Sequence, residues 1–274
     1  IPRLGHLEMV YNPAFIAMGT VIEDFLNPEF VLLGGPPAAT RKVRRVYEEI
    51  GIDRFREVSL PSTELSKVAY NTFIGLKLAF VNTVGEICHK TDANVDEVTD
   101  SLKMADRRLI SKSYMTAGMG DGGSCHPRDN IALSWFARES DLSYDLFEAL
   151  MMQRQEHAAW RAQMRVDRAR DRDLPVGILG VAYKPRLGLT AGSPALLVAE
   201  LLGDMLDPDE RPVLLRDPYV EEFNLGMPET ARCWLVGCKH PEFPSYSFPT
   251  GTVIVDPWRY IPDQDGVTVI RVGE

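Results

Sequence analysis

The sequence predicts an α/β protein: the remnant of an N-terminal Rossmann-like domain, a central all-helical domain and a C-terminal Rossmann-like α/β domain. Two observations predict this order. Short apolar runs alternate with helical segments at both ends of the chain, as in parallel sheets with crossover helices. Between them, a proline-free stretch from Ser62 to about Lys90 has the pattern of one long helix. We expect domains at residues 1–60, 61–172 and 173–274.

The first sixty residues resemble the end of an α/β unit. Residues 7–11 and 30–34 are expected to be buried strands, and residues 38–50 a covering helix. The chain opens with Ile1 rather than Met and enters a strand pattern almost at once. We therefore expect further sequence upstream, including most of this first domain.

The middle of the chain is predicted to be helical throughout. Ser62 is the expected N-cap of the long helix, whose apolar residues occupy nearly its whole circumference. Such a helix is expected to be buried in a domain core or in a subunit interface. Further helices are expected at residues 95–104, 130–139 and 144–170.

Pro175 marks the start of the second α/β domain. We expect strands at residues 176–181, 213–216, 233–236, 252–256 and 267–272, and a helix at 194–206. Ligands of such a domain bind at the carboxyl ends of its strands. Lys184, which follows the first of these strands, is a candidate phosphate contact, although glycines at a strand end are often only packing devices.

Composition excludes several classes of function. The 274 residues are 45% hydrophobic and 25% charged, and thirty basic against thirty-nine acidic residues leave a net charge of −9. This balance argues against binding of nucleic acid. Because no apolar run is long enough to span a membrane and no signal sequence opens the chain, we expect a cytoplasmic protein with no membrane partner.

The four cysteines, Cys88, Cys125, Cys233 and Cys238, are too few and too scattered for a disulfide framework. They also lack the short paired spacing of a structural zinc site. We therefore expect reduced thiols and no metal.

A glycine-rich segment precedes Cys125. Residues 118–123 satisfy G-x-G-x-x-G, but no convincing strand comes before them, so we reject a dinucleotide fingerprint. A thiol beside Arg128 and close to a helix N-terminus is in the environment of a nucleophilic cysteine. The alternative is a glycine turn that carries a small buried cysteine.

Lys67 and Asn71 lie four residues apart and share one face of the long helix. Their polar groups are costly in an apolar helix unless they find partners. They form either an interhelical polar contact or a pair of donors directed at an oxyanion.

Five segments in this order resemble the UDP-glucose/GDP-mannose dehydrogenase family. They are Tyr11-Asn12-Pro13-Ala14-Phe15, Ser66-Lys67-Val68-Ala69-Tyr70-Asn71, Gly120-Asp121-Gly122-Gly123-Ser124-Cys125-His126-Pro127-Arg128-Asp129, Gly180-Val181-Ala182-Tyr183-Lys184-Pro185 and Val255-Asp256-Pro257-Trp258-Arg259. The resemblance implies a cytosolic enzyme that oxidises C6 of a nucleotide sugar twice with NAD and yields a uronic acid. Serine before the cysteine is closer to the UDP-glucose and GDP-mannose branches of the family.

The resemblance also implies roles for individual residues. Cys125 would form a thiohemiacetal and then a thioester, Lys67 and Asn71 would stabilise the oxyanion, and Asp129 would order or deprotonate the hydrolytic water. Arg128, where the family usually has lysine, is assigned to the cofactor. The expected contacts to the sugar nucleotide are Arg108, inserted from a partner subunit, and Gly118, Gly120, Gly122, Tyr183, Lys184 and Arg259. The helix beginning near Ser62 would form the core of a homodimer.

Three departures from the family pattern qualify these roles. Ala14 and Met18 replace two glutamates, Ala191 replaces an arginine that contacts the cofactor, and most of the NAD domain is expected to lie outside this chain. The chain by itself is therefore not expected to bind NAD well or to transfer hydride. The alternatives are a catalytically degenerate homologue that binds nucleotide sugars, or the same chemistry on a GDP- or dTDP-sugar.

Overall fold

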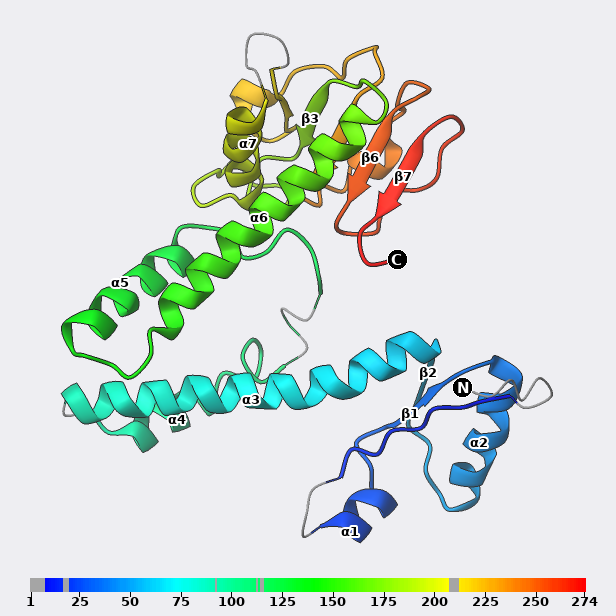
Figure 1. Ribbon diagram of the computed structural model, residues 1–274, viewed down its shortest axis with the longest axis vertical. Coiled ribbons are helices and arrows are strands. Elements are labelled where there is room, and N and C mark those ends of the chain that lie inside the picture. Colours follow the sequence, from blue (N-terminus) through cyan, green and yellow to red (C-terminus); the bar gives the residue numbers. More distant parts are fainter. Residues whose placement is uncertain (1–7, 17–19, 92, 112, 114–115, 207–211) are drawn as a thin grey trace. The chain divides into compact units, whose positions relative to one another are not determined.

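A computed structural model describes residues 8–16, 20–91, 93–111, 113, 116–206 and 212–274 (Figure 1). The chain divides into two compact units, Ile1–Val84 and Gly85–Glu274. Helix α3 (Leu60–Thr91) runs through the point of division. Over the described residues, no helix is both long enough and apolar enough to cross a membrane.

The first unit contains two parallel strands, β1 (Val31–Gly34) and β2 (Phe55–Val58). Helix α2 (Pro37–Glu49) connects them, and a short helix α1 (Val21–Leu26) precedes β1. The small core of this unit contains Val31, Leu33 and Ile52. The predicted strand at 30–34 and the predicted helix at 38–50 are thus present.

The prediction of a strand at residues 7–11 is wrong. Leu7 lies outside the described residues, and of residues 8–11 only Tyr11 pairs, in a single antiparallel bridge with Gly34. The Asn12 side chain then donates to the Leu32 carbonyl at 3.0 Å. Pro13, which follows, has no N–H to donate. The pairing therefore ends after one residue.

Helix α3 begins at Leu60, two residues before the predicted N-cap. The Ser59 hydroxyl accepts the Ser62 N–H at 3.3 Å, so the first turn is capped from outside the predicted helix. Six large apolar side chains on the part of α3 within the first unit are 40% exposed or more: Leu65, Val68, Phe73, Ile74, Leu76 and Phe80. Burial in the core of this unit is thereby excluded for these six side chains.

Three further helices belong to the second unit: α4 (Val95–Lys103), α5 (Cys125–Glu139) and α6 (Leu146–Arg170). Helix α5 begins at Cys125, five residues before the expected start. Pro127 is compatible with this because the first N–H groups of a helix have no acceptor within the helix. The early start places Cys125 itself in the first turn.

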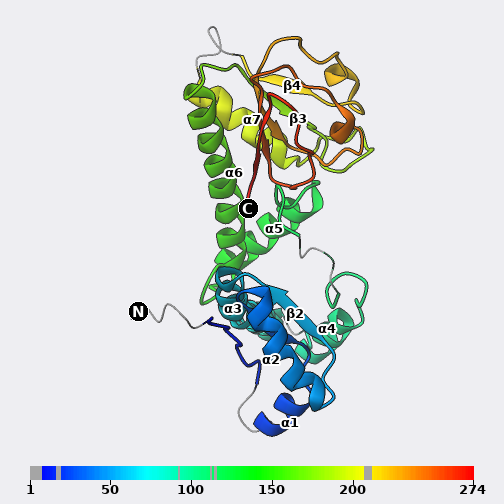
Figure 2. The same cartoon turned by 90° about the vertical axis from the view of Figure 1, so that its right-hand side faces the viewer.

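The second unit also contains a five-stranded parallel sheet with the order β4-β3-β5-β6-β7. Its strands are β3 (Val176–Leu179), β4 (Leu214–Arg216), β5 (Cys233–Val236), β6 (Val253–Asp256) and β7 (Thr268–Arg271), with helix α7 (Pro194–Met205) after β3. The chain leaves β3 for one neighbour, β4, and later returns to pair its other side with β5. Figure 2 shows α6 running beside this sheet.

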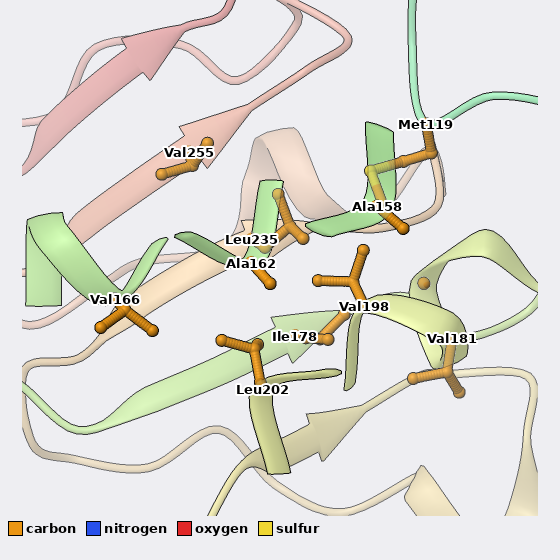
Figure 3. Close-up of a cluster of buried hydrophobic side chains, with 11 residues drawn as sticks. Met119, Ala158, Ala162, Val166, Ile178, Val181, Val198, Leu202, Leu235 and Val255 are labelled. Carbon is orange, nitrogen blue, oxygen red and sulfur yellow. The ribbon is translucent and has the colours of Figure 1, made fainter. Parts of the chain in front are cut away.

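Helices α6 and α7 cover one face of the sheet, as Figure 3 shows for the buried side chains between them. Ala158 and Ala162 of α6 meet Val198 and Leu202 of α7 over the strands. Met119, from the glycine-rich loop, belongs to the same cluster and is only 4% exposed. The core of the second unit therefore anchors the loop that precedes Cys125.

Candidate active site

Cys125 is the first residue of α5 and its side chain is exposed, whereas Cys88, Cys233 and Cys238 are buried. The glycine turn with a small buried cysteine is therefore the wrong alternative. The N-terminus of a helix presents free N–H groups and a partial positive charge, which favour an anion such as a thiolate. The Arg128 guanidinium lies in the same turn. Its hydrogen bond to Asp129 raises the pKa of Arg128, with further contributions from the charges of Asp129 and Cys125.

The backbone of the loop before Cys125 is held by two arginines. Arg161 of α6, which is 6% exposed, donates from Nη2 to the Gly118 carbonyl. Arg259 donates from Nη2 to the Ala117 carbonyl at 2.9 Å. Together with buried Met119, these bonds attach the loop both to α6 and to the segment after β6.

The glycines of this loop have different environments. A Cβ on Gly118 would lie 2.1 Å from the Trp258 ring, so only glycine fits there. Gly120 has φ +107°, a backbone conformation that L-residues with a side chain rarely adopt. Gly122 lies against Tyr183, its Cβ position 3.1 Å from the Cβ of that tyrosine. The absence of side chains thus lets the loop pack on the segments after β3 and β6.

Tyr183 and Lys184 lie in the turn that follows β3, at the carboxyl edge of the sheet. The Asp217 carboxylate Oδ2 accepts the N–H groups of Val181 and Ala182 at 2.8 and 2.9 Å, and thereby fixes the start of this turn. Burial opposes the ionisation of Asp217. Hydrogen bonds from His240 and from backbone N–H groups outweigh it, and the pKa of Asp217 lies below its ordinary value.

Lys184 and Arg259, the two cationic candidates for contacts to the sugar nucleotide at this edge, have different surroundings. Lys184 is exposed, and its ammonium lies 5.6 Å from the centre of the Tyr183 ring. The Arg259 guanidinium donates to three backbone carbonyls, those of Pro257, Val272 and Ala117. Arg259 therefore joins three loop segments through their backbone carbonyls, whereas the ammonium of Lys184 is on the surface.

Within α5, Arg128 and Asp129 pair with each other at 2.9 Å, and both side chains are about two-thirds exposed. Asp121 of the loop pairs instead with Arg154 of α6 at 3.0 Å. No role was expected from the sequence for Asp121, Arg154, Asp217 or His240. Two of them had a sequence signal, because Asp121 lies in the family-like segment around Cys125 and Asp217 directly follows an expected strand.

Lys67 and Asn71 lie in the first unit, where they line a cavity of about 310 Å³ together with Tyr70 and Glu29. The Lys67 ammonium donates to the Ala14 carbonyl at 2.7 Å. It also lies 4.9 Å from the centre of the Phe15 ring. Arg108, in the second unit, is exposed in the turns that follow α4.

The turn between β1 and α2 lacks the features of a dinucleotide-binding turn. Where β1 leads into α2, Pro36 and Pro37 remove two of the N–H donors that such a site presents to phosphate. A Cβ on Gly34 would lie 2.2 Å from the Thr63 hydroxyl, so protein already occupies that approach. Among the residues that the structure describes, no group of three or more His, Cys, Asp or Glu side chains is placed to hold a metal ion.

Comparison with known proteins assigns the chain to a family. Residues 61–154 match the central domain of the UDP-glucose/GDP-mannose dehydrogenase family. The UDP-glucose 6-dehydrogenase of Rhizobium meliloti is 31% identical over 205 residues, which cover 72% of this chain and 46% of that protein. The mouse (Mus musculus) UDP-glucose 6-dehydrogenase is 29% identical over 215 residues, 74% of this chain and 43% of that protein. The chain thus spans about half the length of the curated relatives that it matches.

A crystal structure of a ternary complex of GDP-mannose dehydrogenase from Pseudomonas aeruginosa shares the fold. Its TM-score is 0.80 at 21% identity, and the match covers 95% of this chain and 64% of that one. The α/β architecture with a helical centre and a Rossmann-like parallel sheet is therefore confirmed. Because the Rhizobium meliloti relative is 31% identical over 72% of this chain, and the central domain matches as well, the chain belongs to the UDP-glucose/GDP-mannose dehydrogenase family.

Proposed function

We propose that this chain supplies the thiol and the nucleotide-sugar site of an NAD-dependent nucleotide-sugar 6-dehydrogenase acting on a substrate such as UDP-glucose. The observation that carries the proposal is the exposed Cys125 thiol in the first turn of α5. It follows a loop tied to the carboxyl edge of the parallel sheet. Open α/β sheets bind their ligands at this edge. NAD is the proposed hydride acceptor.

The thiol performs covalent catalysis in this proposal. The Cys125 thiolate adds to the C6 aldehyde of the sugar, and the carbonyl oxygen becomes an oxyanion. Lys67 and Asn71 donate to that oxyanion. After oxidation to a thioester, water oriented by Asp129 attacks the carbonyl carbon, the uronic acid leaves and the thiol is restored.

The sugar diphosphate binds to backbone N–H groups of the loop at Gly118, Gly120 and Gly122. Tyr183, Lys184 and Arg259 are the proposed side-chain contacts at the same edge. A compact, strongly hydrated ammonium such as that of Lys184 suits a phosphate oxygen. Arg128 is the residue of this chain proposed to contact the cofactor.

The same proposal includes a homodimer through α3. The exposed apolar side chains of this helix, such as Leu65, Phe73 and Leu76, are 45 to 68% exposed in the single chain. Contiguous apolar surface of this kind is typical of interfaces. In the dimer, Arg108 would reach the sugar site of the partner subunit.

The test is a panel of UDP-, GDP- and dTDP-sugars given with NAD to the longest product of the gene. We expect NADH from at least one sugar, and loss of NADH in Cys125→Ala with unchanged binding of that sugar. No NADH from any sugar would contradict the enzymatic proposal. Unchanged turnover of Cys125→Ala would contradict the covalent route.

A second candidate is a homologue that binds nucleotide sugars without oxidising them. It is favoured by Ala14, which offers only its backbone carbonyl to Lys67 where the family has glutamate. Met18 lies outside the described residues. Calorimetric titration separates the two candidates, because tight binding of a UDP-sugar without NADH formation would support this second one.

A further inference from the structure

The backbone hydrogen bonds of the glycine-rich loop at residues 117–123 involve its carbonyls and not its N–H groups. Arg161 of α6 donates to the Gly118 carbonyl, and Arg259 donates to the Ala117 carbonyl at 2.9 Å. By contrast, no N–H group of residues 117–123 donates a hydrogen bond within the part of the chain that the structure describes. Met119 is only 4% exposed, so its N–H also has little access to water. These donors are therefore available to a ligand.

The two bound carbonyls fix the directions of two N–H groups. A trans peptide group is planar, and its C=O and N–H bonds point in opposite directions. Because the Gly118 carbonyl is directed to Arg161, the Met119 N–H of the same peptide group is directed away from that guanidinium. The Gly118 N–H is likewise directed away from Arg259. Successive N–H groups in a bent segment are typical donors to anions.

The guanidinium of Arg161 is itself held in one orientation. Its Nη1 donates to His157 Nδ1 at 2.9 Å and to the His157 carbonyl at 3.3 Å, one turn earlier on α6. A guanidinium can only donate, so the imidazole nitrogen is the acceptor. Because the group is planar and bound at two of its nitrogens, it has little freedom to rotate. The Gly118 carbonyl is thus attached to a rigid point on the helix.

The charge of Arg161 is costly to bury. The residue is 6% exposed, and its Nε has no hydrogen-bond partner among the described residues. Burial lowers the pKa of Arg161, and no described carboxylate offsets this cost. Replacing a buried charge of this kind with an apolar residue is often neutral or stabilising. The guanidinium does, however, polarise the peptide group that it binds, and this makes the Met119 N–H a stronger donor.

We propose that Arg161 is a positioning residue for the diphosphate of the sugar nucleotide. The inference rests on the proposed function, in which N–H groups of the loop bind that diphosphate. Arg161 acts through the peptide group between Gly118 and Met119 and does not touch the phosphate. It holds the N–H of this group toward the ligand and increases its partial positive charge. The phosphate oxygens then meet donors that are oriented before binding, so less ordering is needed when the ligand arrives.

The test measures the Kd of UDP-glucose and of GDP-mannose for the 274-residue chain by calorimetric titration, without cofactor. For the sugar nucleotide that binds more tightly, we expect Arg161→Met to raise the Kd about five- to tenfold, because the loop must then be ordered on binding. Arg161→Lys should raise the Kd less, since an ammonium can still donate to the Gly118 carbonyl. This partial rescue separates the orientation of the loop from a general change in packing.

The matched control is Arg165→Met, which removes another buried arginine from α6. The Arg165 guanidinium donates to the Gly177 carbonyl in β3 and not to the loop, so the Kd should stay the same. Urea unfolding should remain cooperative in both Met variants, which shows that they are folded.

Equal Kd values for Arg161→Met and the unchanged chain would overturn the inference, and so would equal increases in Arg161→Met and Arg165→Met. If neither sugar nucleotide binds to the unchanged chain, the proposed nucleotide-sugar site is wrong and the inference is overturned with it. If the Kd rises as expected but the longer protein forms no NADH, the dehydrogenase is rejected and the positioning role of Arg161 is supported.

Discussion

His240 Nε2 lies 3.1 Å from Asp217 Oδ2, and neither side chain reaches solvent. The pair holds both ends of the turn after β3. Asp217 accepts the N–H groups of Val181 and Ala182, while His240 Nδ1 accepts that of Arg186 at 3.3 Å. Two residues that sequence reasoning did not select thus determine the shape of the segment that carries the proposed phosphate contact.

Replacing the buried carboxylate should be costly. We expect Asp217→Asn to lower the free energy of unfolding by about 3 kcal/mol, because several donors lose a charged acceptor in a buried place. Urea unfolding measures this. Asp263→Asn, which removes an exposed partner of Arg271, should change the stability little. Equal stabilities for the two variants would show that the Asp217 pair does not hold the turn.

Acidification should weaken the same contact. Because the pKa of Asp217 is lower in the folded protein than its ordinary value of 3.8, ionised Asp217 stabilises the fold at pH values above 3.8. That stabilisation is lost as the pH falls from about 3.8 through the lower folded pKa. Asp217→Asn should therefore show a weaker fall of stability than the unchanged chain when unfolding is followed between pH 5 and 2.

Gly118→Ala should disturb the loop before Cys125. The added Cβ would collide with the Trp258 ring, and overpacking of this kind costs about 1–3 kcal/mol. Gly203→Ala is the matched control, because nothing lies within 4 Å of a Cβ there and the site is in helix α7. It should stabilise the protein by about 0.5–1 kcal/mol. In thermal unfolding, the Tm of Gly118→Ala should lie below that of the unchanged chain and the Tm of Gly203→Ala above it.

Arg165 on α6 is fully buried, and among the described residues its Nε and Nη1 have no hydrogen-bond partner. Burial lowers the pKa of Arg165 to about 10, which reflects the unfavourable loss of hydration. We expect Arg165→Met to leave the stability unchanged or raise it by about 1–3 kcal/mol. Urea unfolding measures the change. If the free energy of unfolding falls by more than about 2 kcal/mol, the hydrogen bond from Nη2 to the Gly177 carbonyl stabilises the fold by more than burial of the Arg165 charge costs.

Thiol reactivity should separate Cys125 from the other cysteines. Cys88, Cys233 and Cys238 are buried, and burial together with the charge of Asp217 raises the pKa of Cys238 to about 12. Iodoacetamide at pH 7.5 should therefore label Cys125 at least tenfold faster than the others in the folded chain, because the thiolate is the reacting species and must be accessible. Comparable rates at Cys238 would contradict the burial of its thiol.

Sequence patterns predicted most elements because their periodicity is strong. The strands at Val176 and Cys233 and helix α6 lie within a few residues of the expected places. The failures are at positions governed by contacts with distant segments. The strand expected at residues 7–11 is reduced to one bridge because Pro13 ends the pairing. The start of α5 moved to Cys125 because the loop before it is held by α6 and by the segment after β6.

The sequence by itself determined which reactive groups are present: one cysteine after a glycine-rich segment, and a lysine and an amide on one helical face. It also determined the alternation of strands and helices that is typical of a Rossmann-like domain. Only the tertiary structure decided how these groups are held. Asp121 meets Arg154 across 33 positions of the chain, and Asp217 meets His240 across 23. Pairings of this kind depend on how strands and helices pack in three dimensions, which no local pattern of residues encodes.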